Sequence, residues 1–376
     1  MADENAFLQS GATAGFGIRL SYDTDQSRLF VVEAFENAPA FTAGLDRGSE
    51  ITGIGTSASN IRSVTSLFAQ GGSGAVSDAL GPSTPGTARV LRFLDTSGTE
   101  IVTTVTKANY GISPLSPRYG VKIIEDRGRK IGYLNLRTFI DSANAQLRAA
   151  FGQFRAEGVT ELVIDFRYNG GGLVSTADLM GDLMGRGRFA SDVWSITRFR
   201  PSRSSSNETR NFRSEIQSIA PTKIAFIGTD GTASASELVI NSMKSYLNTD
   251  IALIGTNTFG KPVGQIGLDR TQCDDRLRVV AFAKQNADGE GDYYSGLAST
   301  LSRSCRADDD FATALGNPAE ASITQALDFL AGESCTPIIP SGSMINEQAS
   351  QATATRRELL MPKAPNPAQR EMPGTF

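Results

Sequence analysis

The residues best suited to chemistry are a serine and a lysine, in a chain of 376 residues that contains no histidine. Ser234 lies in the run Thr-Ala-Ser-Ala-Ser-Glu at 232–237, and Lys261 follows Thr-Phe-Gly at 258–260. Without histidine, neither a Ser-His-Asp triad nor a Cys-His pair can form, and zinc sites with His ligands are excluded. A serine nucleophile would need another base, and lysine is the main candidate because burial favours its neutral amine.

Ser234 follows a predicted strand at 223–228 and opens a predicted helix from about 235 to 246. The pattern Ser234-x-x-Glu237 is a capping box, so helix capping is the simplest interpretation. The functional alternative uses the same position, because a hydroxyl there lies near the positive end of the helix. The backbone N–H of Ala235 could then stabilise an oxyanion.

Lys261 stands among apolar and glycine neighbours, although a lone lysine in a loop is usually solvated. Gln265 points the same way as Lys261 on an extended strand. Its amide oxygen could accept a hydrogen bond from the amine without adding charge, whereas a carboxylate would favour the ammonium. Pro262 and Gly264 indicate a bend that could bring the two side chains closer.

Three glycines follow Asn169 at the end of a predicted strand at 162–167. Such a run most often marks a tight turn. Alternatively, the missing side chains would let the backbone N–H of Gly171 or Gly172 approach a substrate carbonyl. The glycine run, the serine turn and the lysine segment all fall at strand ends, where α/β folds gather their sites.

Strands alternate with helices from residue 120 onward, which favours a layered α/β core over residues 109–340. Before it, residues 15–108 read as a small β-rich domain, in which the Gly-, Ser- and Pro-rich stretch 71–86 is expected to be a loop. Residues 1–14 form an N-terminal segment. Residues 341–376 are polar and contain several prolines, so we expect a tail that is flexible or lies on the surface.

The β-rich domain resembles a PDZ domain in two motifs. The turn Gly-Phe-Gly-Ile is similar to the carboxylate-binding loop, and Ala-Pro-Ala-x-x-Ala-Gly-Leu-x-x-Gly at 38–48 is similar to the helix and turn that follow. The resemblance implies that backbone N–H groups and an open strand edge bind the C-terminal tail of a peptide. A generic small β domain is the alternative. The implied tail-binding residues are Gly15, Phe16, Gly17 and Ile18.

Several motifs together resemble the carboxyl-terminal processing peptidases, or tail-specific proteases. They are Arg-Tyr-Asn-Gly-Gly-Gly-Leu at 167–173, Gly-Thr-Ala-Ser-Ala-Ser-Glu at 231–237 and Thr-Phe-Gly-Lys-x-x-x-Gln at 258–265. The resemblance implies a crotonase-like peptidase core joined to a PDZ domain. It also implies a serine endopeptidase without metal or cofactor, acting near the flexible C-terminal ends of proteins. The implied catalytic residues are Ser234, Lys261 and Gln265, with oxyanion donors from Ala235 and from Gly171 or Gly172.

One departure concerns the spacing of the implied dyad. The interval of 27 residues from Ser234 to Lys261 is two longer than is usual in the family, and counting back 25 residues reaches Ser236. The local motif nevertheless assigns the nucleophile to Ser234. The extra residues would fit in the turn at about 246–250, and Ser236 would point away from Ser234 within the helix.

The three cysteines, Cys273, Cys305 and Cys335, all lie in the last third of the chain. A predicted hairpin with its turn at 286–291 would place Cys273 opposite Cys305, and we expect these two to form a disulfide. The alternatives are Cys305–Cys335 and three free thiols. A disulfide would indicate an oxidising compartment. The polar start of the chain is no signal peptide, so either the protein is cytosolic or its export segment is missing from this sequence. We expect the second case, with a periplasmic, cell-envelope or secreted location.

Composition excludes little beyond one class of partner. A net charge of −4 does not favour nucleic acid. The oligomeric state is left open. Two rival functions remain at this stage, namely a tail-binding scaffold without proteolysis and crotonase-type acyl-CoA chemistry. The last residues, Pro-Gly-Thr-Phe, are apolar at the end and could occupy the PDZ groove in cis or in trans.

Overall fold

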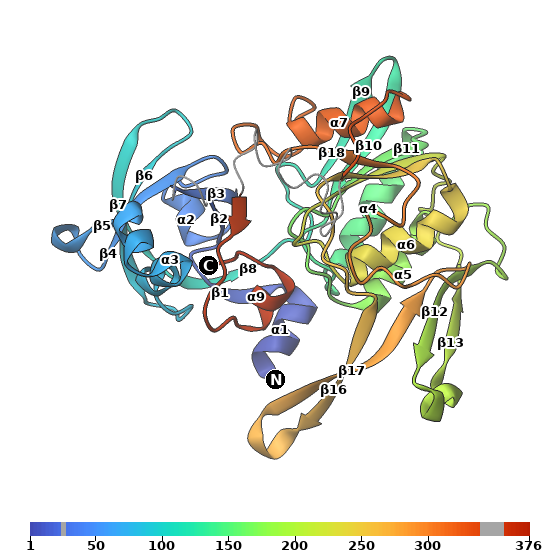
Figure 1. The fold of residues 1–376 in the computed structure, drawn as a ribbon, viewed down its shortest axis with the longest axis horizontal. Coiled ribbons are helices and arrows are strands. Elements are labelled where there is room, and N and C mark those ends of the chain that lie inside the picture. The colour runs from blue at the N-terminus through green and yellow to red at the C-terminus, as the bar shows by residue number, and fades with distance from the viewer. Residues whose placement is uncertain (24–27, 339–356) are drawn as a thin grey trace, which may run out of the picture. The chain divides into compact units, whose positions relative to one another are not determined.

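The computed structural model describes residues 1–23, 28–338 and 357–376, which divide into two compact units (Figure 1). The α/β unit comprises Met1–Gln9, Pro114–Asp309 and Leu315–Gly342. The β-rich unit comprises Ser10–Ser113, Asp310–Ala314 and Ser343–Phe376. The predicted boundaries treat each domain as one continuous stretch, whereas the structure adds Asp310–Ala314 and the tail to the β-rich unit.

A six-stranded sheet forms the centre of the α/β unit, in the order β18-β15-β14-β11-β10-β9. The pairings from β10 through β18 are parallel, and β9 pairs antiparallel with β10. Every residue of β15 is buried, as expected for a strand covered on both faces. The strands are β9 (Val121–Asp126), β10 (Arg129–Asn135), β11 (Glu161–Asp165), β14 (Lys223–Gly228), β15 (Ile251–Gly255) and β18 (Ser304–Arg306).

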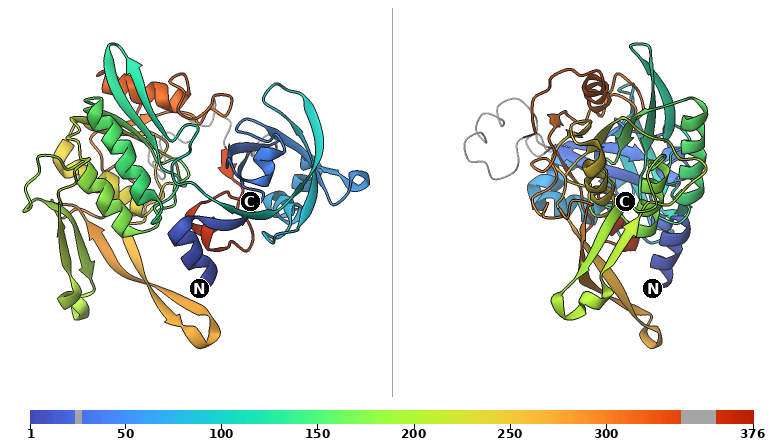
Figure 2. Two further views of the ribbon diagram at one scale, coloured as in Figure 1. Left: turned by 180° about the vertical axis from the view of Figure 1, so that it is seen from behind. Right: turned by 90° about the vertical axis from the view of Figure 1, so that its right-hand side faces the viewer.

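Helices cover both faces of this sheet (Figures 1 and 2). Alternate residues of one strand show the two faces: Ile164 packs in one cluster with α4, α5 and α6, whereas Val163 packs in another with α7. The predicted strand–helix alternation is therefore present. The helices are α4 (Ala143–Ala156), α5 (Val174–Leu183), α6 (Ala235–Leu247) and α7 (Ala321–Leu330), and the N-terminal helix α1 spans Ala2–Ser10.

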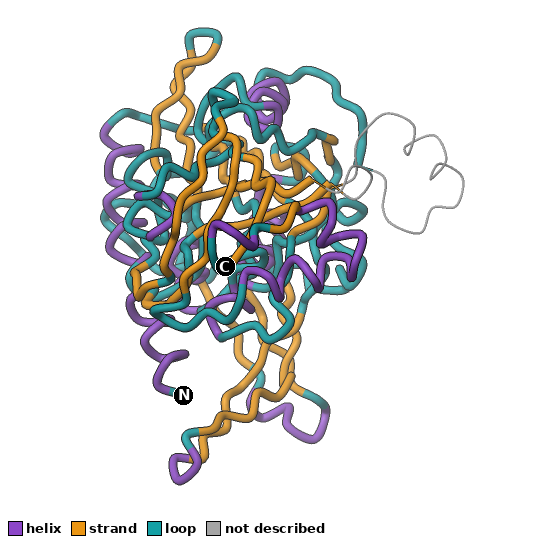
Figure 3. The backbone as a smooth tube through the Cα atoms, turned by 90° about the vertical axis from the view of Figure 1, so that its left-hand side faces the viewer, coloured by secondary structure: helices purple, strands orange, loops and turns teal. Residues whose placement is uncertain are grey.

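A second, four-stranded sheet of the α/β unit extends as a two-armed projection (Figures 1 and 3). Its longer arm is an antiparallel hairpin of β16 and β17, with a register shift between Gly264 and Gln265. The strands are β12 (Val193–Phe199), β13 (Glu208–Asn211), β16 (Val263–Arg270) and β17 (Asp275–Gln285). In the described part of the chain, no helix combines the length and apolar character needed to span a bilayer.

The β-rich unit is built on one antiparallel sheet with the order β19-β2-β3-β4-β6-β7, and β5 pairs with β4. A separate ribbon joins β1 to β8. The strands are β1 (Ala12–Gly15), β2 (Ile18–Asp23), β3 (Arg28–Ala34), β4 (Glu50–Gly55), β5 (Arg62–Ser63), β6 (Ala88–Leu94), β7 (Glu100–Thr106), β8 (Ala108–Gly111) and β19 (Arg357–Leu359). The helices are α2 (Pro39–Thr42), α3 (Val64–Leu80) and α9 (Pro367–Glu371).

The expected loop at 71–86 is wrong for its first ten residues, which belong to α3. Gly71 and Gly72 kink the helix with non-helical backbone angles, but it continues to Leu80. Val76 and Leu80 are buried in the core of the β-rich unit. Burial of this apolar face stabilises the helix against the low helix propensity of its glycines.

Of the two expectations for the tail, the flexible one is wrong for the part that the structure describes. Residues 341–356 lie outside the described residues, but 357–376 pack on the β-rich unit. β19 pairs antiparallel with β2, and Leu360, Met372 and Phe376 are buried. A few apolar side chains are enough for such packing, because each inserts into a core that the rest of the unit already forms. The average composition of the tail does not show which residues do so.

The disulfide joins Cys305 to Cys335, and Cys273 is free and exposed. The predicted Cys273–Cys305 pair is therefore wrong, and its stated rival is confirmed. The error lies in the hairpin. The strand β17 pairs with β16 and β12 rather than with a strand after residue 293, so Cys273 lies at the hairpin tip. Cys335 follows α7 and meets β18, where the Arg306 N–H donates to the Thr336 carbonyl at 2.8 Å.

We expect one free thiol in the denatured, unreduced protein and three after reduction, as measured by thiol titration. Because the disulfide closes a loop of 30 residues, the Cys305→Ser/Cys335→Ser variant should lose about 3–4 kcal/mol of unfolding free energy. Cys273→Ser is the matched control and should change it by less than about 0.5 kcal/mol. Three thiols without reduction would contradict the assignment.

Candidate active site

Ser234 lies in the turn between β14 and α6, with φ 57° and ψ −112°. A positive φ is uncommon for a residue with a side chain and costs on the order of 1–3 kcal/mol. The turn is held in place by Asn169, whose carbonyl accepts the Ala233 N–H at 3.1 Å. The surrounding structure therefore imposes a conformation that a free peptide would avoid, which is typical of functional positions.

The predicted glycine run contacts this turn directly. A Cβ atom on Gly171 would lie 2.8 Å from the Cβ of Ser234 and 3.0 Å from the backbone nitrogen of Ala235. One on Gly172 would lie 2.2 Å from the carbonyl oxygen of Phe139. Both positions also have positive φ, so glycine is required there for space and for backbone conformation.

The two glycines differ in their N–H groups. The Gly171 N–H donates to Oδ1 of Asn169 at 2.9 Å. Gly172 lies opposite Phe139 in an isolated β-bridge. The hydrogen bonds of this bridge join Phe139 to the Gly171 carbonyl and to the Leu173 N–H, so they do not use the Gly172 N–H. Within the described parts of the chain, the N–H groups of Gly172 and Ala235 have no hydrogen-bond partner. The pair that remains open to a ligand is therefore Gly172 and Ala235.

The carboxylate of Glu237 joins the serine turn to the lysine segment. Its Oε2 accepts the backbone N–H groups of Ser234, at 3.0 Å, and of Lys261, at 2.7 Å. Its Oε1 accepts the Thr258 hydroxyl at 2.6 Å and the Gly260 N–H at 2.7 Å. The capping box predicted only the bond to Ser234. Burial raises the pKa of Glu237, although these four hydrogen bonds act in the opposite direction.

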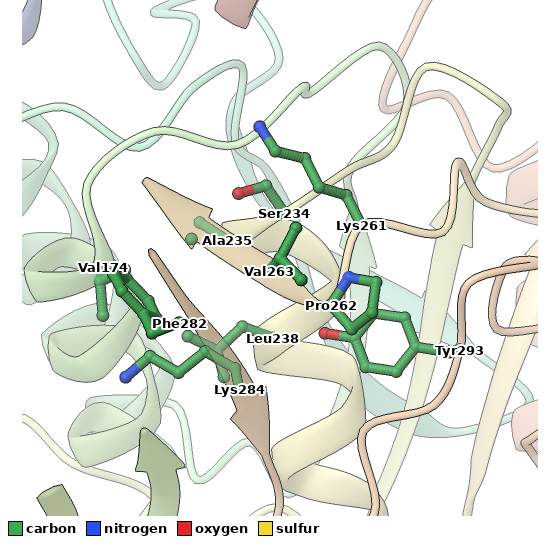
Figure 4. Close-up of a pocket in the computed structure, with 11 residues that line it drawn as sticks. Val174, Ser234, Ala235, Leu238, Lys261, Pro262, Val263, Phe282, Lys284 and Tyr293 are labelled. Carbon is green, nitrogen blue, oxygen red and sulfur yellow. The ribbon is translucent and has the colours of Figure 1, made fainter. Parts of the chain in front are cut away.

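Ser234 and Lys261 line one pocket, shown in Figure 4. The Ser234 hydroxyl and the Lys261 amine lie at the same end of it, and no hydrogen bond joins them in the described structure. Most of the remaining wall is apolar. The lining residues are Val174, Ser234, Ala235, Leu238, Lys261, Pro262, Val263, Gly264, Phe282, Lys284 and Tyr293.

A second lysine, Lys284, lies at the other end of this pocket (Figure 4). It is buried, and its amine donates to the Thr197 hydroxyl at 2.8 Å. Burial lowers the pKa of Lys284, while the charge of Asp178 raises it. No local pattern in the sequence points to Lys284, because it lies within β17, outside the three motifs.

The two serines of the motif have different surroundings. The Ser236 side chain is buried, and its hydroxyl donates to the Asn169 carbonyl at 3.0 Å. Ser236 thus fixes the glycine run against α6, and its hydroxyl is already engaged. Ser234 lines the pocket instead, and its assignment as the nucleophile stays a prediction.

Gln265 is not among the residues that line the pocket. It is exposed on β16, opposite Val280, directly after the register shift that follows Gly264. Its role beside Lys261 stays a prediction. The predicted tail-binding residues, Gly15 to Ile18, belong to the β-rich unit.

The raised pKa of Glu237 predicts how its replacement responds to pH. Since the folded protein binds this proton more tightly than the unfolded chain, the contribution of Glu237 to stability falls as pH rises from its usual pKa of 4.5 to the raised value. Glutamine does not titrate. The melting temperature of Glu237→Gln, relative to wild type, should therefore increase from pH 4 to pH 7.

The matched control, Glu290→Gln, should show the opposite trend in the same melts. The side-chain hydrogen bond from Lys244 lowers the pKa of this more exposed carboxylate, so its contribution to stability is present above its usual pKa and lost below it. Parallel trends for the two variants would show that Glu237 is not held as a buried carboxylate.

Comparison with known proteins relates the region that holds Ser234, Lys261 and the glycine run to one peptidase family. Peptidase family S41 matches residues 130–293. The chain is 28% identical over 275 residues to the chloroplastic C-terminal processing peptidase of Tetradesmus obliquus, covering 69% of this chain and 54% of the relative. It is 26% identical over 253 residues to the carboxyl-terminal-processing protease of a Picosynechococcus species, covering 67% and 55%.

The chain thus spans about half the length of these curated relatives. A solved structure with a similar fold is that of a putative S41 protease from Bacteroides fragilis, with a TM-score of 0.66, 23% identity and 86% of each chain covered. The glycine run, the Ser234 turn and the Lys261 segment all fall within the matched stretch. We conclude that the chain contains a Peptidase family S41 domain at residues 130–293.

Proposed function

We propose that this protein is a serine endopeptidase that cleaves protein substrates near flexible C-terminal ends. Ser234 is the nucleophile, Lys261 the general base, and Gln265 a residue that orients Lys261. The observation that carries the proposal is Oε2 of Glu237, which holds the backbones of Ser234 and Lys261 at one point beside a shared pocket. The shared domain with the C-terminal processing peptidases supports the same assignment.

In the proposed reaction, the neutral amine of Lys261 takes the Ser234 hydroxyl proton as Oγ attacks the scissile carbonyl carbon. The lysine then gives this proton to the departing amine as the C–N bond breaks, leaving an acyl-enzyme. Lys261 then takes a proton from water, which attacks the ester carbonyl carbon, and returns this proton to Oγ of Ser234 as the ester C–O bond breaks and the acid product leaves. The side chains of Ser234 and Lys261 lie at the same end of the pocket (Figure 4). Hydrogen bonds between catalytic groups are often long without substrate and shorten when substrate is bound.

The negative charge on the tetrahedral oxygen requires donors that are already oriented. The N–H groups of Gly172 and Ala235 suit this role, because the Gly171 N–H is engaged by Asn169. Of the two glycines predicted as oxyanion donors, Gly172 is therefore the one that we assign to this role. Removing a single donor of this kind typically costs 10²–10³-fold in rate.

Capture of the substrate tail is assigned to the β-rich unit, as the PDZ-like motifs predict. The proposed binding surface is the part of the edge of β2 facing away from β3 that β19 does not cover, at residues 18–20, with the turn Gly15, Phe16, Gly17 and Ile18 at its start. We call this surface the β2 edge. The Cys305–Cys335 disulfide supports an oxidising location, such as the periplasm, cell envelope or exterior.

One alternative is favoured by a specific observation. Gln265 lies exposed outside the pocket, and the dyad lacks a direct hydrogen bond. A scaffold that binds peptide tails without cleaving them would tolerate both. It predicts peptide binding with no turnover in either the wild type or a nucleophile variant.

The test is digestion of an unfolded protein by the wild type and five variants. Ser234→Ala and Lys261→Ala should each lose at least about 10³-fold in cleavage rate. Glu237→Gln should lose about 10²-fold, because its amide must present an NH₂ group to donors that hold the dyad. Gln265→Ala should lose less than Lys261→Ala.

Ser236→Ala serves as the comparison for Ser234→Ala and should retain measurable cleavage, since Ser236 supports the turn without entering the pocket. Cleavage that survives in Ser234→Ala and vanishes in Ser236→Ala would move the nucleophile. An inactive wild type that binds peptide tails would favour the scaffold.

A further inference from the structure

The last three residues of the chain lie against the β2 edge as an added antiparallel strand. The Phe376 N–H donates to the Ile18 carbonyl at 2.8 Å, and the Leu20 N–H donates to the Gly374 carbonyl at 2.9 Å. Thr375 forms the bridge with Arg19 between them. In Figure 1 the C-terminus is drawn close to β2. This is the main-chain pattern by which a strand edge accepts an extended peptide.

The terminal group of Phe376 meets the predicted carboxylate turn. Its oxygen accepts the Gly17 N–H at 2.8 Å and the Ile18 N–H at 3.4 Å. A Cβ atom on Gly15 would lie 2.8 Å from the carboxyl carbon of Phe376. The turn therefore fits the end of this chain closely, and any side chain at residue 15 would intrude on it.

The side chain of Phe376 is only 2% exposed and belongs to the same core cluster as Phe16, Ile18 and Leu67. This buried position fits a large apolar last residue. Preceding residues hold the strand in place. The Gln369 side-chain amide donates to the Thr375 carbonyl at 2.9 Å, and the Thr375 hydroxyl donates to the Met372 carbonyl at 2.8 Å. The tail is thus built to present its end to the β2 edge.

We propose that Gly374–Phe376 is an internal ligand of the β2 edge, with which substrate tails ending in a large apolar residue must compete. The inference rests on the proposed capture of tails by the β2 edge, but not on cleavage. A tethered ligand acts at an effective concentration on the order of 1 mM. A free tail whose intrinsic Kd is about 10 µM would therefore bind roughly 100-fold more weakly to the intact chain.

The test measures peptide binding in a Ser234→Ala background, which prevents turnover. The probe is a fluorescent decapeptide with the sequence of residues 367–376, followed by fluorescence polarisation. We expect a chain lacking residues 374–376 to bind it at least 10-fold more tightly than the full chain. Equal affinity for both chains would overturn the proposal, and so would the absence of binding to the shortened, folded chain.

Two controls define the mode of binding. The same peptide with an amidated end should bind the shortened chain more weakly, since the turn receives a terminal carboxylate. Adding Gly15→Ala to the shortened chain should have the same effect on the unmodified peptide. If neither change weakens binding, the peptide does not sit in the turn.

Two further measurements cover the case in which the shortened chain does not fold, and show whether the bound tail belongs to the same copy of the chain. If the shortened chain fails to fold, Phe376→Ala in the full chain should release the edge and show the same gain in peptide affinity. If the full chain is a dimer and the shortened chain a monomer, the bound tail comes from a second copy and the intramolecular assignment is wrong. Because no arm measures cleavage, a peptidase without activity would leave this result intact, and the reverse also holds.

Discussion

One buried carboxylate oxygen controls the geometry of the candidate site. Oε2 of Glu237 accepts two backbone N–H groups, one from Ser234 and one from Lys261, which are far apart in the sequence. The second oxygen fixes the residues just before Lys261. An ionised carboxylate is acceptor-only, so it can face all four donors at once. Glutamine, which has the same shape, would turn an NH₂ group toward some of these donors.

The cost of this arrangement is visible in the raised pKa of Glu237. A carboxylate placed here for geometry is less favourable for folding than one in water. Asn169 performs a related task with neutral groups, since it holds both the glycine run and the serine turn. The parallel sheet supplies the common edge at which these two loops meet, and the polar groups set their spacing within it.

The sequence allowed prediction of what is local. The serine turn, the glycine run and the α/β alternation each follow from a short pattern, and the structure places Ser234 and Lys261 at one pocket. Glu237 was recognised only as a capping residue, because its second partner is distant in sequence. Lys284 had no signal. The predicted Cys273–Cys305 disulfide is wrong because the hairpin that contains Cys273 pairs with other strands than expected. The predicted loop at 71–86 is wrong because burial of apolar residues stabilises α3 despite its glycines.

The β-rich unit is assembled from both ends of the chain. The edge of β2 at Arg19 is paired only once Thr375, near the end of the chain, is available. During synthesis on the ribosome, this edge emerges early and stays unpaired until the whole α/β unit has been made. Contacts of such long sequence separation form slowly, and an open edge attracts foreign strands. The order in which the chain is made thus leaves β2 exposed for longest, at the surface that the finished protein keeps occupied.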